Sequence, residues 1–174
     1  MEPDDLEYEL KFVLAPRQVP AAVACLSALC RPDPVHPENV VASIYYDNRQ
    51  LDSFHETAAS DLFKTKVRLR WYEEPKTHRR FPEAFLEAKH RIGLRRSKLR
   101  IAAEGGAQVL ADLPLDHAAL RSLPDSLRCR DRSVPAGLRP LLVVSYHRRR
   151  YFDPTSDSRI CLDTGISVPR VAPG

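Results

Sequence analysis

The stretch Phe63–Glu74, "FKTKVRLRWYEE", alternates between cationic and apolar residues over much of its length. Successive side chains of a β-strand point to opposite faces, so the lysines and arginines at positions 64, 66, 68 and 70 would share one face. Val67, Leu69 and Trp71 would share the other face. The pattern therefore predicts a strand with one basic and one apolar face.

The same alternation recurs along the chain. In Leu6–Val13, "LEYELKFV", it sets Glu7, Glu9 and Lys11 against the apolar residues. Charged and apolar side chains also alternate in the segments 83–91 ("EAFLEAKHR"), 97–102 ("SKLRIA") and 158–164 ("SRICLDT"), while 39–47 and 139–153 are typical of strands in composition. Helical patterns cover 16–30, 48–60 with Asn48 as its cap, and 112–128. About seven strands close together in sequence predict antiparallel pairing in one α+β domain that spans 1–174.

Bulk composition limits the functional classes. The 174 residues include 27 Lys plus Arg and 23 Asp plus Glu, a net charge of +4, so any anion-binding function must depend on where the charges lie. No apolar run approaches the ~20 residues of a membrane helix, and the first residues are acidic, which predicts a cytoplasmic protein without a transmembrane segment or secretion signal. The four cysteines lack metal-ligand spacing and are expected to be reduced structural thiols.

The basic strand faces have two interpretations. An antiparallel sheet often has one solvated face, and charged side chains there need no ligand. Alternatively, the sheet closes into a barrel with the charged face inside and helices over the apolar outside. Burying so many cations is costly unless the barrel holds water and binds a polyanion. Arginine forks and lysine point charges both suit phosphate oxygens.

These stretches together carry a family resemblance. Glu7–Lys11 has the form ExExK, which resembles the opening signature of the triphosphate tunnel metalloenzymes. Within that superfamily the chain is most similar to the VTC domain, the polyphosphate polymerase branch. The supporting stretches, in the family's order, are "SIYYDN", "KVRLRWYEE", "FLEAKHR", "SKLRI", "VSYHRRRYF" and "RICLDTGI".

The resemblance implies a tunnel of antiparallel strands that transfers the terminal phosphate of ATP onto polyphosphate with Mn²⁺ or Mg²⁺. The residues that it implies for phosphate binding and catalysis are Lys11, Arg68, Arg70, Lys89, Lys98, Arg148 and Arg159, with Arg100 as a further phosphate ligand. Glu7, Glu9 and Glu87 would lie near the metal. Because Arg148, Arg149 and Arg150 are consecutive, the strand register stays open, and the Tyr-x-Arg form favours Arg148.

The chain departs from the family pattern near its end. Family members continue past the LDT segment with a glutamate-bearing strand and a lysine-bearing strand, whereas this sequence stops at Gly174. We therefore expect a tunnel that lacks its C-terminal strands and is open on one side. Whether a second copy in a homodimer or a membrane partner joins it stays open.

Other functions remain as alternatives. The related CYTH branch hydrolyses triphosphate compounds and shares ExExK. An inactive tunnel would be a binding module for polyphosphate or inositol polyphosphates. Nucleic-acid binding also suits basic strands with aromatic residues, but the modest net charge and interleaved carboxylates argue against it.

Overall fold

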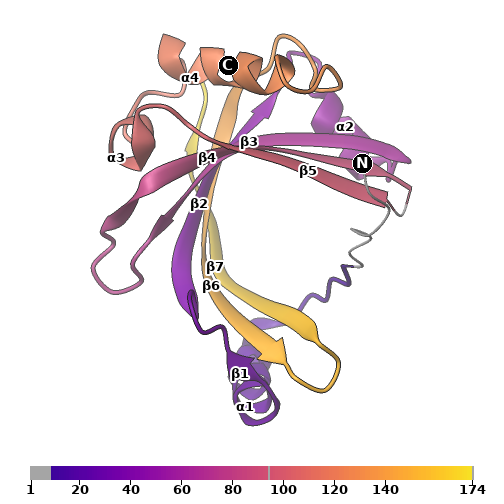
Figure 1. The fold of residues 1–174 in the computed structure, drawn as a ribbon, viewed down its shortest axis with the longest axis vertical. Helices are drawn as coiled ribbons and strands as arrows, with labels where there is room; N and C mark the ends of the chain where they lie inside the picture. The colour runs from indigo at the N-terminus through magenta and orange to yellow at the C-terminus, as the bar shows by residue number, and fades with distance from the viewer. Residues whose placement is uncertain (1–8, 94, 174) are drawn as a thin grey trace.

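Strand β3 (Phe63–Glu73) lies inside a curled antiparallel sheet, with partners on both sides (Figure 1). The computed structural model describes residues 9–93 and 95–173. The other strands are β1 (Arg31–Pro32), β2 (Glu38–Asp47), β4 (Arg80–Ile92), β5 (Arg95–Ala102), β6 (Arg139–Asp153) and β7 (Ser158–Val171). The helices are the 3-10 turn η1 (Pro16–Gln18), α1 (Val19–Leu29), α2 (Asp52–Ala58), α3 (Gly106–Leu110) and α4 (Ala118–Arg128).

The strand order makes the sheet a half-barrel. Its strands follow the order β1-β6-β2-β3-β4-β5, and β7 pairs with the other edge of β6. Among the described residues, β5 and β7 do not pair with each other, so the curl stays open on one side. The predicted α+β class with a curled antiparallel sheet and outer helices is confirmed.

The apolar face of the sheet forms the core. Ile44, Leu69 and Leu86 are fully buried on β2, β3 and β4, and they pack in one cluster with Leu120 and Leu127 of α4. Helices α3 and α4 thus cover the convex side. Since neighbouring side chains alternate, the charged residues of the same strands point to the concave side.

The predicted N-terminal strand is wrong for the part that the structure describes. Residues 9–15 have neither helix nor strand, and Leu10 and Phe12 are each 82% exposed; residues 6–8 lie outside the described range. The segment instead runs past the open side of the sheet toward α1 (Figure 1). Alternation alone does not make a strand, because a strand also needs a hydrogen-bonding partner.

Two helix boundaries also differ from prediction. The expected helix 112–128 is confirmed as α4 at its C-terminal end, but α4 begins only at Ala118, and a separate short helix, α3, ends before it at Leu110. Pro114 lies between them and lacks the amide proton a continuous helix needs, and the His117 ring then caps α4 by accepting from the Ala119 amide. Helix α2 begins at Asp52 rather than beside Asn48, although the Asn48 side chain does accept from the Asp52 amide.

Among the described residues, no helix is both long enough and apolar enough to cross a bilayer.

We expect Leu120→Ala to destabilise the fold by about 2–5 kcal/mol, since it leaves a cavity where α4 meets the sheet. Urea unfolding followed by circular dichroism measures the change. Leu62→Ala is the matched control, because Leu62 is 70% exposed and should cost less than about 0.5 kcal/mol. Equal losses in both variants would contradict the assignment of the core.

Candidate functional site

Strand pairing arranges charged side chains in two rows across the concave face. Arg68 of β3 lies opposite Glu87 of β4, which lies opposite Arg100 of β5; we call these three the Glu87 row. The next concave row is made by Lys66, Lys89 and Lys98, the lysine row. The two rows lie side by side because residues two apart on a strand share a face.

Glu87 is the buried centre of this face, with its side chain only 1% exposed. Four cations surround it: its distances are 2.7 Å to Arg68 Nη2, 2.8 Å to Lys98 Nζ, 3.6 Å to Arg100 Nε and 3.9 Å to Arg70 Nη1. Burial alone would raise the pKa of Glu87, but the neighbouring positive charges outweigh this effect and lower the pKa to about 2. The carboxylate is therefore ionised at neutral pH and serves as their common counter-charge.

Arg70 is held in place from two further sides. Its guanidinium is nearly buried, and it donates from Nε to Ser43 Oγ and from Nη2 to the Tyr146 hydroxyl, each at 3.1 Å. Burial raises the pKa of Tyr146 despite the nearby arginines, so the hydroxyl keeps its proton at neutral pH. On the other side of the row, Arg100 stacks 3.6 Å above the Phe85 ring.

The lysine row has less counter-charge. Burial lowers the pKa of Lys66, and the charges of Lys11, Lys64 and Lys89 lower it as well. Lys89 Nζ lies 3.3 Å from Glu9 Oε2, which also lies 3.9 Å from Lys11 Nζ. Like charges directly opposite on neighbouring strands are destabilising, so this row would be stabilised by a bound anion.

The structure brings some of the predicted site residues together and leaves others apart. It brings together Arg68, Arg70, Glu87, Lys89, Lys98 and Arg100, with Glu9 and Lys11 beside Lys89. Glu7 lies outside the described residues. Arg159 is exposed on β7 opposite Phe152, and strands β6 and β2 separate it from β3.

Arg148 lies on the concave side but carries its own counter-charge. Its Nε and Nη2 atoms each donate to Asp163 at 2.7 Å, a bidentate pair. Burial lowers the pKa of Arg148, and Asp163 more than reverses this, so the net shift is upward. By alternation Arg150 shares this face, whereas Arg149 points to the other and meets Glu38. The register thus agrees with the choice of Arg148 over Arg149.

The described residues do not by themselves fit a metal site. They contain no group of three His, Cys, Asp or Glu side chains placed to hold an ion. Both oxygens of Glu87 already lie within 2.8 Å of a cation, on Arg68 and Lys98. The Mn²⁺ or Mg²⁺ site at Glu7, Glu9 and Glu87 stays a prediction.

Three residues of the concave face, Lys66, Ser43 and Tyr146, are not among the site residues predicted from the sequence. Lys66 is absent from the residues that the family resemblance implies, although its alternation with Arg68 and Arg70 places it on the same face. Ser43 and Tyr146 orient Arg70 from β2 and β6, and no pattern within either strand signals that role. As a whole, the face presents fixed guanidinium and mobile ammonium groups, which suit a chain of phosphates.

The sequence comparisons agree with this geometry. The family model of the VTC domain matches residues 6–171, which covers nearly the whole chain and every strand of the sheet. A comparison with curated protein sequences gives no match.

We expect Glu87→Gln to destabilise the protein most at neutral pH. A carboxylate whose pKa is about 2 in the folded protein, against 4.5 as its ordinary value, contributes stability above pH 4.5 and loses it as pH falls toward 2. The pH-dependent part amounts to about 3 kcal/mol. Urea unfolding at pH 7, 5 and 3 measures it, with exposed Glu83→Gln on the same strand as control. A difference from wild type that does not shrink with acid would contradict this account of Glu87.

Proposed function

The chain belongs to the VTC-domain family, and from that premise we propose that its concave face binds polyphosphate and ATP and transfers the terminal phosphoryl group of ATP to polyphosphate. Family membership points to a polyphosphate-related function. The lysine row is the observation that supports the finer proposal. Its three lysines lie opposite one another on neighbouring strands, and the nearby carboxylate of Glu87 is already shared by four cations, one of which is Lys98.

The two rows have different roles in this proposal. Lys66, Lys89 and Lys98 attract the phosphate chain as point charges, and their long side chains adapt to its position. The guanidinium groups of Arg68 and Arg100 offer planar donors at fixed positions beside Glu87. The phosphates would lie along the face over both rows, where they replace water as the partner of the surplus cations.

Arg70 is proposed to stabilise the transferred group. A terminal oxygen of polyphosphate attacks the γ-phosphorus of ATP, the bond to the β–γ bridging oxygen breaks, and ADP leaves. Such transfer depends on positioning and on neutralising charge rather than on a protein nucleophile. Ser43 and Tyr146 fix the Arg70 guanidinium beforehand, so little reorganisation is needed. The predicted Mn²⁺ or Mg²⁺ would arrive with the substrate phosphates, as Mg²⁺ commonly does.

A second candidate is a polyphosphate-binding module without turnover. Two observations favour it: Asp163 already neutralises Arg148, and the described residues gather no three-carboxylate group for a metal. Both candidates require the same anion-binding face, so they differ in the products formed from ATP.

We expect Lys89→Ala to weaken tripolyphosphate binding about tenfold, because it removes one charge-assisted contact from the lysine row. The Lys89 side chain is 42% exposed, so the change should leave the fold intact. Isothermal titration at fixed ionic strength measures the affinity. Lys76→Ala, in the turn between β3 and β4, is the control with the same loss of charge. Equal weakening by both variants would mean that only net charge matters.

Incubation of the protein with ATP and short polyphosphate should lengthen the polyphosphate and release ADP in equal amount. We expect Arg70→Lys, which keeps the charge and loses the fork held by Ser43 and Tyr146, to reduce the rate at least tenfold. Arg79→Lys in the β3–β4 turn is the control. Formation of ADP and orthophosphate without longer polyphosphate would indicate a triphosphate hydrolase instead, and tight binding with no product would indicate the binding module.

A further inference from the structure

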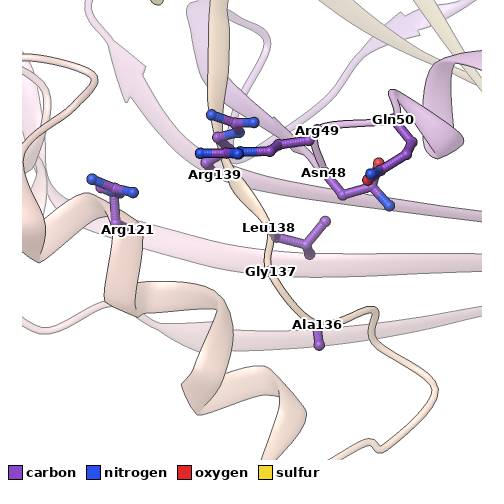
Figure 2. A pocket seen from close by; sticks show the side chains of 8 residues that line it. All are labelled: Asn48, Arg49, Gln50, Arg121, Ala136, Gly137, Leu138 and Arg139. Atoms are coloured by element: carbon purple, nitrogen blue, oxygen red, sulfur yellow. The ribbon is translucent and has the colours of Figure 1, made fainter.

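A second group of arginines lies outside the concave face, where β2 ends and β6 begins. Arg49 follows β2, Arg121 projects from α4, and Arg139 is the first residue of β6; all three line one cavity of about 460 Å³ (Figure 2). Asn48 and Gln50 add two side-chain amides to the same wall. The volume falls within the ~300–1,000 Å³ of typical ligand sites.

The cavity is positively charged and lacks counter-charge. No Asp or Glu side chain lines it. Within residues 9–93 and 95–173, Arg49, Arg121 and Arg139 form no salt bridge and no side-chain hydrogen bond. Asp47 lies opposite Arg139 in the strand pairing, but its carboxylate accepts the amides of Asn48, Ser53 and Phe54, so within the described chain the three arginines have no carboxylate as a salt-bridge partner. Their mutual repulsion would be relieved by an anion.

The backbone that carries these arginines is held firmly. Asp47, buried beside Asn48, accepts hydrogen bonds from the amides of Ser53 and Phe54 and so fixes the loop between β2 and α2. Leu120 precedes Arg121 and is fully buried, and Leu138 precedes Arg139 and is 7% exposed. The guanidinium groups therefore extend from three anchored points around the cavity, which lowers the ordering cost of binding.

We infer that this arginine cavity is a second anion site, which binds a short chain of phosphates, either free oligophosphate or the tail of a nucleoside triphosphate. Arginine forks match phosphate oxygens in pairs, and three forks from different elements can engage successive phosphates. The site shares no residue with the Glu87 row or the lysine row, so it does not depend on the function proposed for the concave face.

Arginine footprinting tests this site residue by residue. The protein is treated with phenylglyoxal, with and without tripolyphosphate, and mass spectrometry measures the modification of each arginine. We expect tripolyphosphate to slow modification of Arg49, Arg121 and Arg139 at least fivefold and to leave exposed Arg128, on the same helix as Arg121, unchanged. Unchanged rates at the three arginines, or equal protection by sulfate at the same ionic strength, would overturn the inference.

Further arms identify the ligand and separate the two sites. Protection by ATP as well as by tripolyphosphate would point to a nucleotide tail, and protection by tripolyphosphate alone to free oligophosphate. In titrations, the double variant Arg49→Gln and Arg121→Gln should lose one class of tripolyphosphate sites and keep the class that Lys89→Ala weakens. Arg128→Gln should keep both. Loss of both classes in the double variant, with its fold intact, would contradict a separate site.

Discussion

The buried carboxylate of Glu87 is the interaction on which the concave face depends. Its single negative charge lies within 4 Å of four cationic side chains from β3 and β5. Without Glu87 those cations would repel one another across the sheet, and without them the buried carboxylate would be strongly destabilising. This mutual compensation allows three neighbouring strands to turn their charged faces inward while their apolar faces pack under α3 and α4.

The carboxylates neutralise the cationic side chains of the concave face more completely on one side than on the other. Toward β6 and β7, Asp163 pairs with Arg148, and the uncharged side chains of Ser43 on β2 and Tyr146 on β6 contact Arg70. On the β3–β5 side, three lysines share the contacts offered by Glu9 and Glu87. Positive charge therefore accumulates over the strands β3, β4 and β5, and a phosphate chain would find its strongest attraction there. The Arg148–Asp163 pair, by contrast, acts mainly as a structural ion pair between β6 and β7.

The net charge of +4 conceals this local segregation. The arginine cavity, where β2 ends and β6 begins, is lined by three arginines and by no carboxylate of the described residues, while acidic residues elsewhere keep the total low. The concave face and the arginine cavity are thus two separate concentrations of positive charge on one small domain. They also show why total charge is a poor guide to anion binding.

The sequence by itself determined which side chains share a face, because strand alternation has a local period of two. It identified β3, β4, β5 and β6, their cationic sides and the family. Strand order and register were decided by the tertiary structure alone. Leu6–Val13 alternates as clearly as Phe63–Glu74, yet residues 9–13 form no strand, since no partner there supplies hydrogen bonds. Likewise Lys66 joins the site whereas Arg159 lies beyond two intervening strands, a separation set by long-range pairing that no local pattern encodes.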